Sequence, residues 1–255
     1  MKKVVALVGS ARKKATYRAV QEFERVLKQS VEVDFEYVFL HEYNLEFCRG
    51  CLVCFNKGEQ LCPLRDDRDL LLEKLEQADG VLVATPNYAF HVSARVKNLL
   101  DRLAFIFHRP QFFGKTYTAL VVQGFLGGND IRKYLESTGK NFGFDVVKGT
   151  SVTTHDPMTE KQQEQLMKKV HKVAERFKKQ LMRSTSPSPS FLRLVMFRIT
   201  RNMIKGLDPS FRDHQHFEEQ GWFESDYYYE TSLGLGKRMV GRCSDLVGRR
   251  VAKNQ

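Results

Sequence analysis

The chain has 255 residues, of which 42% are hydrophobic, enough to bury the core of one domain together with an extension. Apolar runs such as residues 4–8 and 81–84 have the length of strands, far below the roughly 20 residues of a membrane-spanning helix. The start of the chain turns charged too soon for a signal peptide, so we expect a cytoplasmic protein. The net charge of +11 is spread along the chain, and we expect no nucleic-acid partner.

Strand-like and helix-like segments alternate along the first 183 residues. Strands are predicted at residues 3–8, 31–40, 80–85, 117–123 and 145–152, and helices at residues 15–28, 69–77, 92–107, 131–140 and 161–182. This alternation predicts a parallel sheet with helices on both faces. The fold class is therefore α/β, with a doubly wound five-stranded sheet whose ligand site lies at the carboxyl ends of the strands.

The rest of the chain is a linker and an extension. Residues 1–183 form the predicted domain, residues 184–190 (Ser-Thr-Ser-Pro-Ser-Pro-Ser) a linker, and residues 191–255 an extension that packs on the core or on a partner subunit. Residues 191–207 suit an amphipathic helix, with one apolar face and one basic face: Leu192, Met196, Ile199 and Met203 against Arg193, Arg198, Arg201 and Lys205. Such a helix lies on an acidic membrane or packs on a second subunit, and we favour the subunit.

The loop after the first strand, residues 9–17, is suited to an anion. Gly9 permits a tight turn, and the hydroxyls of Ser10 and Thr16 lie beside the backbone amides that open the next helix. Arg12 brings a positive charge. The loop matches neither the three-glycine dinucleotide fingerprint nor the Gly-Lys-Ser/Thr loop, so a phosphate monoester fits better than a pyrophosphate. The alternative is an ordinary strand-to-helix turn.

Two further loops end at the same predicted edge of the sheet. Pro86 ends the third strand, and Tyr88 and Phe90 flank a short turn that could present an aromatic ring and backbone groups to a flat heterocycle. The alternative here is a plain hydrophobic turn. In residues 124–130, Gly124 and Gly127 would let the backbone approach such a ring closely.

Four of the five cysteines lie within residues 48–62, a density typical of metal-binding or redox-active sites in intracellular proteins. Cys48, Cys51 and Cys54 recur every third residue, and Cys62 is followed by proline. This spacing suits a 4Fe-4S cluster. Two alternatives stay open, which are a zinc ion held by the four sulfurs and thiols that hold no metal.

Four motifs in this order resemble a known family. They are Gly9-Ser10-Ala11-Arg12-Lys13, the cysteine cluster that ends in Asp66-Asp67, Thr85-Pro86-Asn87-Tyr88, and Asp101-Arg102. Together they resemble the NADPH-dependent FMN reductases of the flavodoxin-like superfamily, and within it the branch of the iron–sulfur flavoproteins. The likeness covers residues 1–183. Ala11 replaces a usual proline, and Lys14-Ala15 replace a frequent Asn-Gly pair.

The resemblance implies a flavodoxin-like fold and an FMN site. It implies that the FMN phosphate is held by Ser10, Arg12, Thr16 and Tyr17. It also implies that the isoalloxazine is lined by Pro86, Asn87, Tyr88 and Phe90, with Gly124 and Gly127 on its other side.

By the same resemblance, the reaction moves electrons from NAD(P)H through FMN to a small acceptor such as a quinone or free flavin. No side chain is expected to act as a catalytic acid or base, since the cofactor carries the chemistry. The alternative is an electron-transfer protein whose flavin and cysteine cluster serve a protein partner. The family also implies a homodimer, and we expect no membrane contact.

Overall fold

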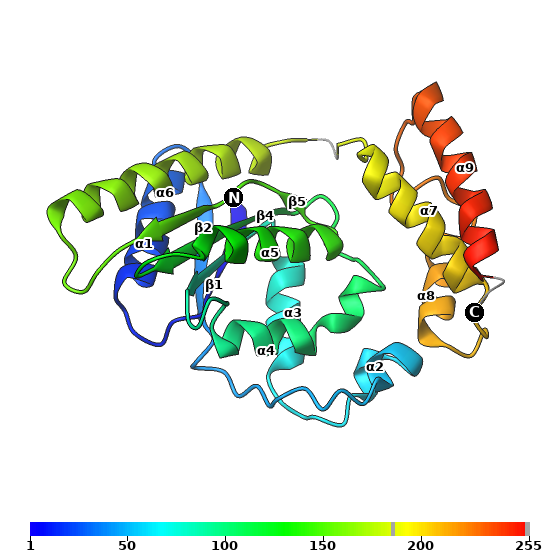
Figure 1. The fold of residues 1–255 in the computed structure, drawn as a ribbon, viewed down its shortest axis with the longest axis horizontal. Helices are drawn as coiled ribbons and strands as arrows, with labels where there is room; N and C mark the ends of the chain where they lie inside the picture. Colours follow the sequence, from blue (N-terminus) through cyan, green and yellow to red (C-terminus); the bar gives the residue numbers. More distant parts are fainter. Residues whose placement is uncertain (185–186, 253–255) are drawn as a thin grey trace. The chain divides into compact units, whose positions relative to one another are not determined.

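The computed structural model describes residues 1–184 and 187–252. These residues divide into two compact units (Figure 1). The first unit comprises Met1–Arg49 and Leu64–Ser184, and the second comprises Gly50–Pro63 with the described part of the chain after Ser184. Of the predicted linker at residues 184–190, residues 185 and 186 lie outside the described residues. In this division, most of the cysteine-rich segment belongs with the C-terminal extension.

The first unit is built on one parallel sheet. Its strands are β1 (Lys2–Val8), β2 (Val33–Phe39), β3 (Gly80–Pro86), β4 (Thr116–Gln123), β5 (Asp145–Val146) and β6 (Thr150–Thr153). The strand order is β2-β1-β3-β4-β5, and β6 also pairs with β4. Every pairing is parallel, which confirms the predicted fold class. The winding reverses between β1 and β3, where a doubly wound sheet opens its ligand crevice.

The strand predicted at residues 145–152 is divided into β5 and β6, both beside β4. Between them, the backbone N–H of Gly149 donates to Oε1 of Glu136 on α5 (Gly128–Asn141) at 2.8 Å. A bond to a helix side chain takes this N–H out of the ladder with β4. The prediction of one continuous strand was therefore wrong at this point, although its place in the sheet was right.

Helices cover both faces of the sheet (Figure 1). On one face, α1 (Ala15–Lys28) packs against α6 (Glu160–Leu181), and the rings of Phe23 and Phe177 meet at 5.2 Å. The other face carries α3 (Arg68–Gln77), α4 (Ala94–Arg102) and α5. The helix predicted at residues 92–107 is two elements, α4 and the 3-10 helix η2 (Ala104–Phe107).

A buried ion pair holds the segment before the cysteines. Arg102, at the end of α4, pairs with Asp66 before α3, and their side chains are only 2% and 1% exposed. Oδ2 of Asp66, which pairs with Arg102, also accepts a hydrogen bond from the backbone N–H of Glu46, at 2.8 Å. Burial alone would raise the pKa of Asp66, but the hydrogen bonds from Arg102 and from the N–H groups of Glu46 and Arg68 outweigh it and lower the pKa.

Two more polar side chains complete this clamp. Asp67, directly before α3, accepts from the backbone N–H of Asn44 at 2.7 Å. Asn98 on α4 donates to the carbonyls of Leu45 and Glu46 and accepts from the N–H of Cys48 at 3.3 Å. The clamp of Asp66, Asp67, Asn98 and Arg102 therefore fixes residues 44–48 onto the sheet domain.

The second unit is helical. It contains α2 (Val53–Asn56), the 3-10 helix η1 (Glu59–Leu61), α7 (Phe191–Lys205), α8 (Arg212–Glu219) and α9 (Leu235–Ala252). Helix α7 packs along α9, and Ser190 caps α7 by accepting from the N–H of Arg193. None of the described helices is long and apolar enough to cross a membrane.

The basic face of α7 is not a uniformly exposed charged surface. Arg198 and Arg201, placed on the basic face by sequence, are buried. They are buried because Asp245 on α9 pairs with both, and Asp226 pairs with Arg198. Leu192 and Met196 of the predicted apolar face are 71% and 56% exposed, so this face is open at these two residues.

The aromatic run at residues 222–229 forms the core of this second unit. Phe197 of α7 contacts the rings of Tyr227 and Tyr228, at 5.4 and 4.5 Å. Trp222 packs edge-on against Phe217 and donates from Nε1 to the carbonyl of Tyr228. The run is thus used for packing.

The clamp yields a stability prediction. Replacing Arg102 with Met leaves the Asp66 carboxylate buried without its cation, so we expect a loss of about 3–5 kcal/mol in the free energy of unfolding. The loss should shrink in acid, because a carboxyl with a lowered pKa contributes stability that is present above the unfolded pKa of about 4 and disappears as the pH falls through the folded value. Urea unfolding at pH 7 and at acid pH measures both effects.

Lys97→Met is the matched control on the same helix. Lys97 pairs with Asp101, and these side chains are 45% and 44% exposed, so its loss should cost at most about 1 kcal/mol. Equal costs for the two variants would contradict the clamp.

Candidate functional site

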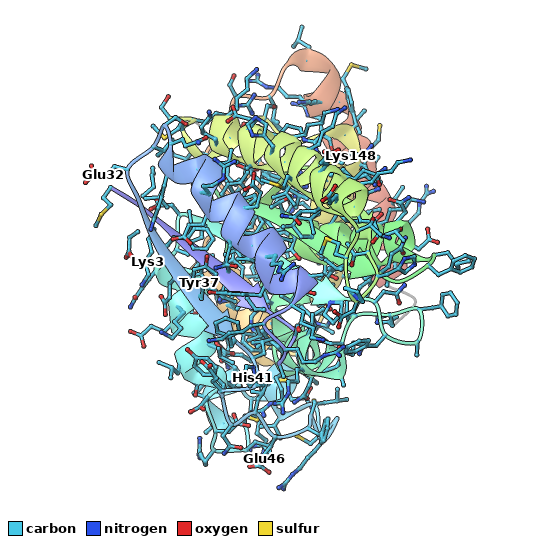
Figure 2. All side chains as sticks on the ribbon, turned by 90° about the vertical axis from the view of Figure 1, so that its left-hand side faces the viewer. Lys3, Glu32, Tyr37, His41, Glu46 and Lys148 are labelled. Carbon is cyan, nitrogen blue, oxygen red and sulfur yellow. The ribbon has the colours of Figure 1, made fainter. Side chains whose placement is uncertain are left out.

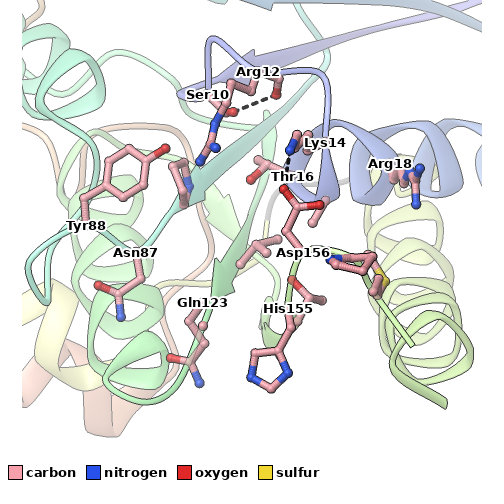
Figure 3. Close-up of a pocket in the computed structure, with 17 residues that line it drawn as sticks. Ser10, Arg12, Lys14, Thr16, Arg18, Asn87, Tyr88, Gln123, His155 and Asp156 are labelled. Carbon is pink, nitrogen blue, oxygen red and sulfur yellow. Dashed lines mark hydrogen bonds and ion pairs between the residues drawn. The ribbon is translucent and has the colours of Figure 1, made fainter. Parts of the chain in front are cut away.

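Four loops of the first unit meet at the carboxyl edge of the sheet and enclose a pocket of about 370 Å³ (Figure 3). They follow β1, β3, β4 and β6. The volume lies within the range of small-molecule sites, and the position is the one expected for a doubly wound sheet. The pocket has a cationic end beside α1 and an aromatic end beside the loop after β3.

The cationic end is built on the loop between β1 and α1. The N–H of Gly9 donates to the carbonyl of Ala84 on β3, and the hydroxyl of Ser10 donates to the carbonyl of Arg12, both at 2.8 Å. Helix α1 begins at Ala15, so its first N–H groups, which have no acceptor earlier in the helix, face this loop. These donors and the helix dipole favour an anion here.

Three cations and one carboxylate surround this end. Arg12, Lys14 and Arg18 line the pocket together with Asp156 from the loop after β6. Lys14 forms an ion pair with Asp156, drawn as a dashed line in Figure 3. The hydrogen bond and charge of Lys14, with the charges of Arg12 and Arg18, lower the pKa of Asp156. Asp156 is therefore ionised at neutral pH.

At the aromatic end, the loops after β3 and β4 are tied together. Asn87 donates from its backbone N–H to the carbonyl of Val122 and from Nδ2 to that of Leu126, each at 2.7 Å. Tyr88 and His91 exchange backbone hydrogen bonds across a tight turn, and Ala89 and Phe90 within it have φ angles of 48° and 60°. Residues other than glycine rarely adopt such angles, and the few residues that do are often found at functional sites.

The loop after β6 is held by the cap of α6. Thr159 and Gln162 form a reciprocal capping box, and Oε1 of Gln162 also accepts from the N–H of His155. This fixes the loop that carries Asp156. This fourth loop was not predicted from the sequence, although the pattern Thr-x-x-Gln at 159–162 and the position after a predicted strand both indicate it.

The structure brings seven of the ten predicted residues to this pocket: Ser10, Arg12, Thr16, Pro86, Asn87, Tyr88 and Gly124. The lining also includes residues that were not predicted: Lys14, Ala15, Arg18, Val122, Gln123, Thr154, His155, Asp156, Pro157 and Met158.

The predicted phosphate ligand Tyr17 lies elsewhere. Its ring packs against Tyr37 and Phe39 of β2, each at 5.6 Å, and Lys13 lies over it. Tyr37 is labelled on this edge strand in Figure 2. Tyr17 faces this aromatic cluster because the residue after Thr16 falls on a different side of the helix.

Phe90 and Gly127, which are not among the lining residues, lie beside each other next to Asn87. Gly127 has a φ angle of 89°, and a Cβ atom there would come within 2.9 Å of Cδ1 of Phe90. Phe90 and the neighbouring Phe125 are exposed. Position 127 therefore requires glycine because its backbone lies close to the Phe90 side chain of the same protein.

The four clustered cysteines are divided between the two units. Cys48 belongs to the first unit, at the end of the clamped segment, and Cys51, Cys54 and Cys62 belong to the second. Among the residues that the structure describes, no three His, Cys, Asp or Glu side chains lie close enough together to hold a metal ion. The donor chemistry suits iron–sulfur or zinc, but no assembled ligand set is present, and the metal assignment stays a prediction.

Comparison with known proteins identifies the family. Residues 2–157 match the family of NADPH-dependent FMN reductases, a span of more than half the chain. The chain belongs to this family.

Its curated relatives include iron-sulfur flavoproteins. One from Archaeoglobus fulgidus is 33% identical over 144 residues, covering 55% of this chain and 64% of that protein. One from Methanocaldococcus jannaschii is 33% identical over 102 residues, covering 39% of this chain and 51% of that protein. The match thus spans between half and two thirds of these relatives. A third, from Clostridioides difficile, is 25% identical over 224 residues, covering 84% of this chain and 93% of that protein.

Solved structures agree on the fold. The azoreductase AzrA superposes with a TM-score of 0.54 at 15% identity, covering 69% of this chain and 99% of its own. RosB superposes with a TM-score of 0.58 at 12% identity, covering 92% of each chain. These similarities establish that the chain has a flavodoxin-like fold.

The two glycines at the ends of β1 and β4 give a paired prediction. A Cβ atom at Gly9 would lie 2.5 Å from Cγ2 of Val96 and 2.7 Å from Oγ of Ser93, whereas one at Gly124 would meet nothing within 4 Å. Gly9→Ala should therefore lower the free energy of unfolding by about 1–3 kcal/mol, the usual cost of overpacking. Gly124→Ala should change it by less than about 0.5 kcal/mol. Urea titration of both variants checks this. Similar losses in the free energy of unfolding would mean that the backbone at Gly9 shifts to accommodate the added methyl group.

Proposed function

We propose that this protein binds FMN in the pocket at the carboxyl edge of the sheet and passes electrons from NAD(P)H through it to a small acceptor. The observation that carries the proposal is a single pocket that joins the cationic start of α1 to the aromatic loop after β3. A molecule with an anionic end and a flat aromatic end matches both. Membership of the NADPH-dependent FMN reductase family supports the same reading.

The phosphate would bind at the cationic end. Ser10, Arg12 and Thr16 would hold it with the first N–H groups of α1, as the helix dipole favours. A phosphate monoester carries a charge of about −1.5 to −2 at neutral pH. Three lining cations minus the one carboxylate leave +2, which matches that charge.

The flavin ring would bind at the aromatic end, between the loops after β3 and β4. Pro86, Asn87, Tyr88 and Gly124 supply a ring face, backbone groups and space for close approach. When bound, FMN accepts a hydride and releases electrons, so this chain's residues need only position the reactants and limit water. The exposed rings of Phe90 and Phe125 give an apolar rim where a flat donor or acceptor would stack.

Turnover tests the proposed activity directly. Purified protein loaded with FMN should oxidise NADPH or NADH when free FMN or a quinone is present. Comparing the two nucleotides and the two acceptors would define the donor and the acceptor. A protein that holds FMN but shows no turnover with either acceptor would favour the electron-transfer alternative.

The phosphate site can be tested by binding. Arg12→Ala removes one charge-assisted hydrogen bond, so FMN binding should weaken by about 1.5–3 kcal/mol. Fluorescence titration of the flavin-free protein measures this loss. Riboflavin, which lacks the phosphate, should bind both proteins equally, and Arg25→Ala in the last turn of α1 serves as a control. An unchanged FMN dissociation constant would place the phosphate elsewhere.

A second candidate function rests on the cysteines and on the relatives named iron-sulfur flavoproteins. In it, a cluster held by Cys48, Cys51, Cys54 and Cys62 would exchange electrons with a protein partner. Iron and sulfide analysis of anaerobically purified protein tests it, together with the visible absorption spectrum. A flavin spectrum without bound iron would exclude this candidate for the purified protein.

We also propose that the protein is a homodimer formed through α7 and α9. These helices expose Leu192, Met196, Leu235, Met239 and Leu246. Two-fold pairing is the commonest way for identical chains to bury such surface. The double variant Leu192→Glu/Met239→Glu should then have the mass of a monomer in light scattering, while the parent protein has twice that mass. A monomeric parent protein would overturn the proposal.

A further inference from the structure

The loop after β6 places one carboxylate among the cations at the cationic end of the pocket, called the phosphate end below because the FMN phosphate is proposed to bind there. Asp156 lies opposite Lys14 across the mouth of the pocket, and Figure 3 shows its carboxylate pointing toward the Lys14 ammonium. The two side chains are 61% and 56% exposed, so both are accessible from solvent. The charges of Arg12 and Arg18 also act on Asp156. A single carboxylate therefore faces all three cations of this end.

Lys14 holds a position where it could serve an anion at the start of α1. It is the residue directly before α1, beside the helix's first N–H groups, and it makes no side-chain cap of its own helix. Its ammonium is instead held by Asp156. An anion bound at the helix start would reach the same ammonium, so the anion and Asp156 compete for one cation.

We propose that Asp156 is a built-in counterion of the phosphate end, which a bound phosphate displaces from Lys14. This inference rests on the proposed FMN site and goes beyond it, because it assigns an opposing role to a residue within the lining. Asp156 offsets the mutual repulsion of the three cations before binding. When FMN is bound, the Asp156 carboxylate repels the phosphate. It therefore lowers the affinity of the protein for FMN.

Three variants test the competition in the full-length, flavin-free protein. Asp156→Asn removes the competing charge and frees Lys14, so the FMN dissociation constant should fall about two- to fivefold, as expected for a solvent-exposed charge interaction. Lys14→Met leaves Asp156 unpaired and should raise that constant by a similar factor. The double variant restores the original net charge and should lie between the two single variants.

The controls separate this inference from the proposed function. Riboflavin binding should not change in any of the three variants, because riboflavin lacks the phosphate. Glu160→Gln, at the first position of α6, makes the same change in net charge and should leave FMN binding unchanged. Raising the salt concentration should reduce the effect of Asp156→Asn, since exposed charges are screened.

Two results would overturn the inference in different ways. If FMN binds more tightly than riboflavin but Asp156→Asn leaves FMN binding unchanged or weakens it, Asp156 is not a competitor and the FMN site stands. If wild-type protein does not distinguish FMN from riboflavin and Arg12→Ala has no effect, the phosphate site itself fails, and the inference fails with it.

Discussion

Strands β1, β3 and β4 are buried on both faces, and this double burial sets the position of three of the four loops in the candidate site. A parallel ladder with helices on both faces leaves little freedom of register, because the paired strands share fixed partners from Val4–Gly80 to Val8–Ala84. The carboxyl ends of these strands therefore reach the same edge. A loop that carries cations and a loop that carries an aromatic ring are brought together without any bond between them being needed.

Around this frame, buried arginines pair with carboxylates at defined positions. Arg102 pairs with the buried Asp66 and fixes the approach to the cysteines. Arg198 and Arg201 pair with Asp245 between α7 and α9, and Arg198 also pairs with the exposed Asp226. Burying a charge is costly unless its partner is also buried and well oriented. The pair of Asp66 and Arg102 therefore holds the backbone at Glu46 in one place.

The sequence predicted the parallel sheet and three of the four site loops, because continuous apolar runs and the residues after them are local signals. It could not predict that Arg198 and Arg201 are buried, since their partners Asp226 and Asp245 lie 28 and 44 or more residues away. The division of the strand at residues 145–152 likewise depends on Glu136 of α5, a contact between distant segments. The position of the Tyr17 ring also depends on a distant segment, because the ring packs on Tyr37 of β2. Each of these features depends on a contact between residues that are distant in the sequence, which local sequence patterns do not predict.

The charges at the cationic end of the pocket explain why the fourth loop matters. Arg12, Lys14 and Arg18 alone would give +3 beside the positive end of a helix, more than a phosphate monoester neutralises. Asp156 lowers this to +2 and does so from a loop that the capping box of α6 holds in place. Lys14 thus has its counterion at Asp156 in the fourth loop. A site that adds a cation together with its own competing anion gains charge balance without gaining the full affinity of the added cation.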